Sequence, residues 1–278
     1  MNPWTSKALS LPGAVAAWGQ QQDGSIWQDD GTSELDMAAI GATWVASGGP
    51  GDALPGYWSL DGVDDYLRRD SPEDPDLNLG SSGDGYFWVA LVMDRTGSIG
   101  ESFAAWLSKG DSTYQLRHDS SSNTSLIFNV RGGTGGNAST GTGSFLSADR
   151  WNMVVAQQDD SGQIRVFVSG GNTAGDTITS EMQEVSSSSR TGTVGTDDGS
   201  RFQVGAQDNS GTLRRFVPGN VAAVAVGTGG FLTLAQMDEL RLSTFEEPSE
   251  PAFDPANLSV VVSGSTASLS WDASPLLA

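Results

Sequence analysis

The chain has 278 residues, with 34 acidic and 14 basic side chains, so its formal net charge is −20 at pH 7. This excess of negative charge argues against nucleic acid or an anionic membrane surface as a partner, because phosphate groups would be repelled. Cysteine is absent, which excludes disulfides, thiolate metal sites and a cysteine nucleophile. No apolar run approaches the ~18 residues of a membrane-spanning helix, and the first 20 residues lack the apolar stretch of a secretory signal.

Short apolar segments separated by Gly, Asp and Ser indicate an all-β protein. The spacing of these segments, without a helical repeat between them, excludes a βαβ sheet and predicts an antiparallel β-sandwich. The expected strands cover residues 57–62, 86–94, 102–110, 114–119, 125–132, 150–159, 163–170, 201–207 and 219–229.

One short helix is expected near residues 233–241. Thr233 is placed to cap its first turn through the side-chain hydroxyl. Leu234, Met237 and Leu240 follow at a spacing that puts them on one helix face. We therefore expect this helix to lie on the sandwich.

The composition changes near the end of the chain and predicts three parts. Residues 1–245 form the main domain, and residues 246–256 read as a stiff linker rich in Pro and Glu. Residues 257–278 contain two alternating segments that predict a β-hairpin. The hairpin's apolar positions predict an interaction surface that consists of Val260, Val262, Leu269 and Trp271.

The segment WSLDGVDDYL, residues 58–67, resembles the opening of a laminin-G-like domain of the concanavalin A-like jelly-roll superfamily. The segments at 106–117, 145–170 and 201–240 follow in the order that is usual for such domains, so the resemblance covers about residues 10–245. It implies a jelly-roll sandwich, a fold that often binds calcium at one rim. Residues 257–278 resemble the first two strands of a fibronectin type III domain, with Trp271 at the tryptophan position of the second strand.

Clustered aspartates make calcium the expected cofactor. Calcium takes six to eight oxygen ligands from carboxylates and carbonyls in loops. Asp61, Asp64 and Asp65 in one turn, or Asp29 and Asp30 in another, can supply such oxygens. The alternative is that these aspartates only build Asx turns.

The chain contains nine tryptophans, and the faces of tryptophan rings can stack on sugar rings, so a sugar-binding role is one interpretation. Trp27 and Trp44, together with Trp4, lie near predicted loops and are the candidate glycan-binding residues. Packing in the core is the competing interpretation for each of them. It is favoured for the tryptophans inside predicted strands, which are Trp58, Trp88, Trp106 and Trp151.

No catalytic residues are expected. Glycoside hydrolysis needs a pair of carboxylates across a cleft, and the nearest string, Glu34-Leu35-Asp36, lacks the second glutamate of the hydrolase pattern. The single histidine, His118, and its neighbour Asp119 point to opposite faces of a strand, so they would not form a catalytic relay. His118 is predicted to be an exposed strand residue.

These features together predict a non-enzymatic protein of the virion surface of a tailed bacteriophage: a head decoration, head fibre or minor tail protein. Its expected partners are other virion proteins, host surface glycans and further copies of the same chain. The alternative is an extracellular or cell-surface carbohydrate-binding module, or an adhesin fragment, of a larger secreted bacterial protein.

Overall fold

The structure is a computed structural model. It describes residues 1–19, 21–23, 25–69, 75–79, 86–96, 102–110, 113–119, 122–131, 138–141, 149–159, 161–169, 178–189, 194, 200–209, 212–245, 258–263 and 266–271. None of the helices in these ranges is long and apolar enough to span a membrane.

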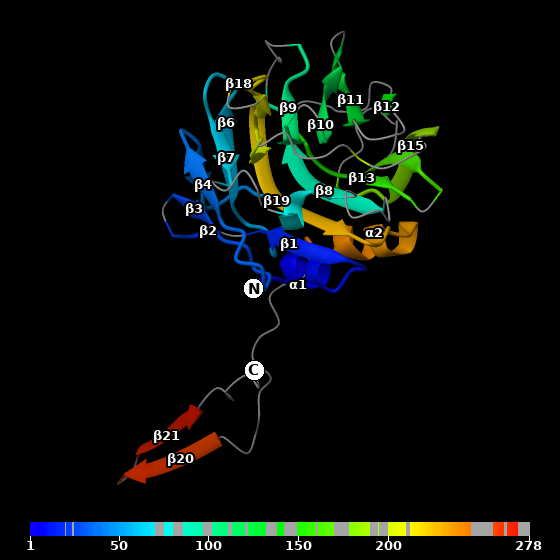
Figure 1. Ribbon diagram of the computed structural model, residues 1–278. Helices are drawn as coiled ribbons and strands as arrows, with labels where there is room; N and C mark the ends of the chain where they lie inside the picture. Colours follow the sequence, from blue (N-terminus) through cyan, green and yellow to red (C-terminus); the bar gives the residue numbers. More distant parts are fainter. Residues whose placement is uncertain are drawn as a thin grey trace.

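Two large sheets form the main domain in the described part of the chain (Figure 1). The first, eight-stranded sheet consists of β1 (Ala14–Trp18), β5 (Thr43–Val45), β6 (Tyr57–Asp61), β8 (Phe87–Asp94), β13 (Trp151–Gln158), β14 (Gln163–Ser169), β15 (Met182–Ser189) and β19 (Pro218–Thr228). The second, nine-stranded sheet consists of β2 (Gln21–Asp23), β3 (Ile26–Trp27), β4 (Met37–Ile40), β7 (Tyr66–Arg68), β9 (Ala105–Lys109), β10 (Tyr114–Asp119), β11 (Ser122–Val130), β12 (Ala138–Gly141) and β16 (Phe202–Val204).

Every strand pair in these two sheets is antiparallel, so the predicted antiparallel β-sandwich is confirmed. The described residues also form a small hairpin of β17 (Gln207–Asn209) and β18 (Thr212–Arg214), and a short 3-10 turn, η1 (Pro75–Leu77).

The main core lies between the two sheets, and a second apolar layer lies on the other side of the eight-stranded sheet. Strand β8 shows both layers, because its successive side chains point to opposite faces. Phe87, Val89, Leu91 and Met93 belong to the core between the sheets. Trp88, Ala90 and Val92 belong to the outer layer. Both faces of β8 are buried, which is why this segment reads as one continuous apolar run.

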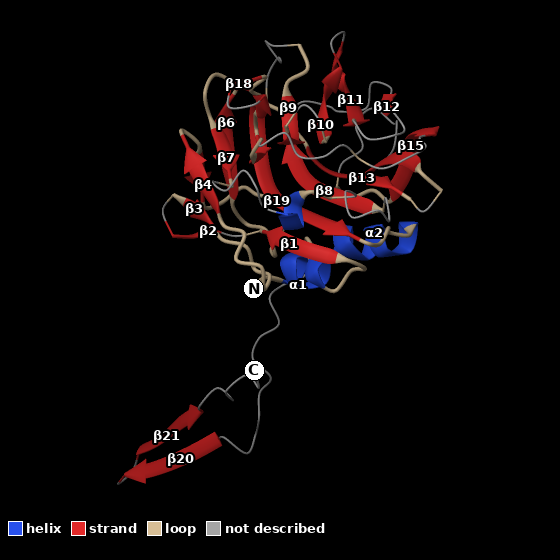
Figure 2. Ribbon diagram, in the orientation of Figure 1, coloured by secondary structure: helices blue, strands red, loops and turns tan. Residues whose placement is uncertain are grey.

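Two helices cover that outer layer (Figure 2). Helix α2 (Leu234–Leu242) confirms the expected helix, and Thr233 caps it together with Gln236 in a capping box. Helix α1 (Pro3–Leu9) was not expected. Its local signal is present in the sequence, since Asn2 accepts the Thr5 amide at 2.8 Å and Pro3 occupies the first helical position.

The C-terminal hairpin consists of β20 (Leu258–Ser263) and β21 (Thr266–Trp271), which pair antiparallel in a two-stranded sheet of their own. Val260 is the register partner of Leu269, and Leu258 that of Trp271. The predicted linker at 246–256 and the side chains of the hairpin lie outside the described residues. The division into three parts and the fibronectin-like character of the hairpin therefore stay predictions.

Candidate functional site

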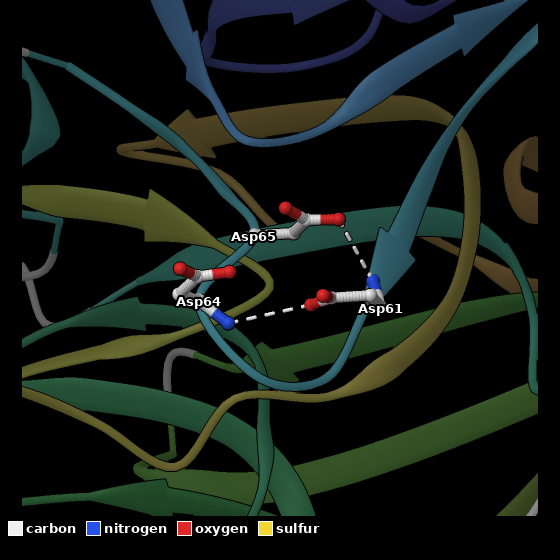
Figure 3. Close-up of side chains that lie close together, drawn as sticks. All are labelled: Asp61, Asp64 and Asp65. Carbon is white, nitrogen blue, oxygen red and sulfur yellow. Dashed lines mark hydrogen bonds between the residues drawn. The ribbon is translucent and has the colours of Figure 1, made fainter.

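The turn between β6 and β7 brings together the three aspartates that the sequence analysis proposed as calcium ligands (Figure 3). One carboxylate oxygen from each of Asp61, Asp64 and Asp65 lies within 4.8 Å of the other two. Two ligands that each sit about 2.4 Å from one calcium ion are at most that far apart, so the spacing fits a shared ion.

The same carboxylates also hold the turn together. Oδ1 of Asp61 accepts the amides of Val63 and Asp64, at 2.7 and 3.3 Å, and Oδ2 of Asp65 accepts the amide of Asp61 at 3.0 Å. Burial raises the pKa of Asp65, and the negative charges of Asp61 and Asp64 raise it further, whereas the bond from the Asp61 amide acts in the opposite direction. The turn is thus an Asx-type turn in which three carboxylates lie close together. A bound cation would offset the repulsion between their negative charges.

Asp29, from the alternative calcium candidate, has a structural role. Its Oδ1 accepts the amides of Ala17 and Gly31, both at 2.9 Å, and its Oδ2 accepts the amide of Leu35 at 3.3 Å. Burial raises its pKa, and these backbone bonds oppose the rise. Because its carboxylate accepts hydrogen bonds from three backbone amides, Asp29 links separate segments of the chain. We therefore assign it a structural role and not a role as a calcium ligand.

The expected glycan-binding role of Trp27 is wrong, because its side chain is fully buried in the core between the sheets. Trp4, the third tryptophan expected near a loop, belongs to α1 and is likewise fully buried, in the outer apolar layer. Trp44 is half-buried, and its ring packs edge-on against Trp58 with the centroids 5.5 Å apart. Trp44, on the edge strand β5, is therefore the one tryptophan of these three that is exposed to solvent at all.

The expected exposure of His118 is also wrong. Only 1% of this residue is exposed. Its backbone register places it opposite Leu126, whose side chain belongs to the core between the sheets. Alternation divides the side chains of β10 between two faces, but it does not show which face is covered.

A row of polar side chains crosses the nine-stranded sheet on the face that points away from the core. Its members are cross-strand partners, one on each of five neighbouring strands. Alternation along β10 sets the face, because Tyr114 and Leu116 belong to the core and Gln115 between them points away from it. We call these residues the polar row: Asn129, Gln115, Ser108, Gln203 and Arg68.

Four of the five side chains of the polar row are shielded from solvent although the row lies on an outer face. Ser108 and Gln203 are fully buried, and Gln115 is 1% and Asn129 5% exposed. Within the described part of the chain, both amide atoms of Gln203 and Oδ1 of Asn129 lack a hydrogen-bond partner. An unpaired buried polar group costs about 1–3 kcal/mol, so a group of them needs an explanation.

The chain after β16 passes over this face. The hydroxyl of Ser108 donates to the carbonyl oxygen of Ala206 at 3.0 Å, and the β17–β18 hairpin follows directly. The polar row is not among the sites predicted from the sequence. Its only local signal is the alternation of polar and apolar residues in the segments 114–119 and 125–132, and the row itself depends on the register between strands.

No protein-family model matches the sequence, and no curated protein matches it either. Solved structures do match the fold. The binding domain of Paraclostridial Mosquitocidal Protein 1 matches with a TM-score of 0.61 and 11% identity, over 82% of this chain and 52% of that chain. This chain therefore spans about half the length of that protein's binding domain.

Two further structures show the range of proteins that contain this fold. Domain 4 of AbnA, an extracellular arabinanase from Geobacillus stearothermophilus solved with arabinotriose, matches with a TM-score of 0.52 and 12% identity, over 82% of this chain and 98% of that chain. Trypanosoma rangeli sialidase in complex with sialic acid matches with a TM-score of 0.54 and 17% identity, over 89% of this chain but only 38% of the sialidase. At such identities the likeness shows a shared antiparallel β-sandwich fold.

Proposed function

We propose that this chain is a non-enzymatic glycan-binding domain. The observation that carries the proposal is the polar row, and above all the fully buried amide of Gln203, neither atom of which has a hydrogen-bond partner in the described part of the chain. A side-chain amide presents a donor and an acceptor side by side, which suits two neighbouring sugar hydroxyls. A hydroxyl-rich ligand would therefore satisfy these groups, which have no partner among the described residues.

The fold of domain 4 of AbnA supports the proposal, because that domain was solved with an arabinose oligosaccharide and matches over almost its whole length. Because most of the polar row is shielded from solvent, glycan binding requires a change in the protein. A glycan reaches Gln203 only after the covering segment near Ala206 moves aside, so we expect binding to be coupled to movement of the β17–β18 hairpin.

A glycan array followed by titration tests this function, with Gln203→Leu as the decisive variant. Leucine has a similar shape and removes the unpaired amide, so the variant should be as stable as the wild type or more stable. Its glycan affinity should nevertheless fall at least tenfold. The matched control is Gln183→Leu on the exposed face of β15, which should leave affinity unchanged. A wild type that binds no glycan, or a Gln203→Leu variant that binds as well as the wild type, would overturn the proposal.

We further propose that the domain acts on the virion surface of a tailed bacteriophage, where glycan binding would attach the particle to its host. This rests on the resemblance of the sequence to a laminin-G-like domain joined to a partial fibronectin-like segment. Protein analysis of purified particles tests it, and absence of the chain from such particles would contradict it. The alternative is a carbohydrate-binding module or adhesin fragment of a larger extracellular protein, for which glycan binding would need no capsid or tail partner.

Calcium is the proposed cofactor, and its ligands would be Asp61, Asp64 and Asp65 with neighbouring carbonyls. The spacing of the three carboxylates supports it. An ion at this turn would fix the β6–β7 connection at the rim of the sandwich. The C-terminal hairpin, with Val260, Val262, Leu269 and Trp271, is the proposed contact to a virion protein or to another copy of the chain.

A further inference from the structure

Beside the polar row, the ring of Phe103 contacts two guanidinium groups. The Arg117 guanidinium carbon lies 4.5 Å from the ring centroid, and that of Arg215 lies 5.2 Å from it. Both distances are typical of cation–π contacts. We call Phe103, Arg117 and Arg215 the arginine–phenylalanine cluster.

The backbone at this cluster is unusual. Phe103 has φ +65° and Arg215 has φ +60°, and left-handed backbone is uncommon for residues other than glycine and disfavoured for bulky ones. The two strained residues come from distant parts of the sequence and touch each other through the ring and the guanidinium. Strain of this kind persists where the surrounding structure holds it in place, and it is concentrated at functional sites.

Hydrogen bonds fix the position of Arg215. Its carbonyl oxygen accepts the amide of Ala105 at 2.8 Å, which attaches it to the start of β9. Its Nη1 donates to Oε1 of Gln207 at the start of β17. The guanidinium is therefore oriented before any ligand arrives, which lowers the entropic cost of binding.

The cluster and the polar row belong to one surface. Arg117 follows Gln115 by two residues in β10, so both side chains leave the sheet on the same face, roughly 7 Å apart along the strand. Arg117 is 6% exposed, whereas Phe103 and Arg215 are half-buried and offer the accessible part of the cluster.

The charge of the cluster is opposite to that of the chain. Two guanidiniums gather at one ring in a protein whose net charge is −20. Guanidinium groups pair best with planar oxyanions, to which they donate two parallel hydrogen bonds. Such a pair is stronger where water is partly excluded, as it is at Arg117.

We propose that the arginine–phenylalanine cluster binds the carboxylate of an acidic sugar in a glycan whose neutral part contacts the polar row near Gln115. This inference rests on the proposed function. It adds the ligand class, a carboxylate-bearing glycan, and the residues that select it. Neutral hydroxyls would meet the amides of the row, and the acidic sugar would meet Arg117 and Arg215.

Two matched pairs of probes test the proposal: oligogalacturonate with its methyl ester, and sialyllactose with lactose. Each pair differs in the presence of a carboxylate charge. The wild type should bind the acidic member of at least one pair at least tenfold more tightly than the neutral member. Arg215→Gln and Arg117→Gln should each reduce that preference at least fivefold. Arg165→Gln is the matched control, because Arg165 is a partly exposed arginine that pairs with Asp159 on the eight-stranded sheet.

The possible outcomes separate the two proposals. Equal binding of both members of each pair, or a preference that survives both arginine substitutions, would overturn the acidic-sugar site and leave the glycan-binding function standing. Absence of binding to every glycan would overturn both. If Arg117→Gln does not fold, the half-buried Arg215 decides the question, with its melting temperature as the check on folding.

Discussion

Nε1 of Trp106 donates a hydrogen bond to Nε2 of His118, and the two atoms are 2.8 Å apart. The bond requires Nε2 to be an acceptor, so the imidazole is neutral and carries its proton on Nδ1. Burial, and to a lesser extent the positive charge of Arg95, lower the pKa of His118 to about 3, although the backbone of Ser125 acts in the opposite direction. Protonation would break the bond to Trp106 in the core.

This arrangement predicts a loss of stability in acid. The unfolded chain protonates His118 near its ordinary pKa of ~6.5, whereas the folded chain does so only near 3. The histidine's contribution is therefore complete above pH 6.5 and is lost as the pH falls toward 3. Between pH 6 and 4, the wild type should lose about 2–3 kcal/mol of unfolding free energy relative to His118→Gln.

Denaturant unfolding at several pH values measures this difference. The comparison with His118→Gln is necessary because Asp29, Asp65 and Asp94 have raised pKa values, which favour the folded state in acid and so oppose the histidine. The glutamine carbonyl can still accept from Trp106. Parallel pH profiles for the two proteins would show that His118 is not buried in the neutral form.

Asp29 should be among the most important carboxylates for stability. Asp29→Ala leaves the amides of Ala17 and Gly31 without an acceptor, and we expect a loss of about 2–4 kcal/mol. Asp29→Asn keeps one acceptor oxygen and should lose less. The exposed Asp52 provides the control, since Asp52→Ala should change stability by less than ~0.5 kcal/mol. Equal losses for Asp29→Ala and Asp52→Ala in urea unfolding would contradict the assigned role.

The proposed calcium site predicts a change of sign for one substitution. In the presence of chelator, Asp64→Asn should raise the melting temperature slightly, because it removes a negative charge next to Asp65. In the presence of calcium it should lower the melting temperature, because it removes a ligand. Wild-type melting curves with and without calcium complete the test. If neither calcium nor chelator changes the melting temperature, the turn does not bind calcium and is only an Asx turn.

The C-terminal hairpin should be dispensable for folding and required for attachment. An isolated two-stranded hairpin is marginally stable in water, and its apolar edge would promote aggregation unless it is covered. Deletion of residues 251–278 should leave a folded, monomeric sandwich whose melting temperature is unchanged within a few degrees. The same deletion should abolish assembly or particle attachment, measured by light scattering and by co-sedimentation with particles. If the truncated chain instead fails to fold, the hairpin is part of the core of the main domain and the prediction is wrong.

Local sequence patterns were sufficient for the central strands and for helix α2. The apolar runs at 86–94 and 150–159 became the central strands β8 and β13, because strands buried on both faces need no partner information to be recognised. Thr233 predicted the start of α2 because a helix cap is a contact within one turn of the chain. Asp61, Asp64 and Asp65 are likewise close in space because they share one turn.

What the sequence could not show is which surfaces are covered and which strands are neighbours. Trp27 and His118 were expected at the surface, but the two sheets close over them, and burial depends on packing between segments far apart in the chain. The polar row joins β7, β9, β10, β11 and β16, and Phe103 meets Arg215 across more than a hundred residues. Strand register and sheet order decide such neighbours, and a period-two pattern specifies a face of a strand without naming its partner. Sequence alone therefore determined a β-sandwich with an acidic rim turn, and only the tertiary structure assembled the polar row and the arginine–phenylalanine cluster.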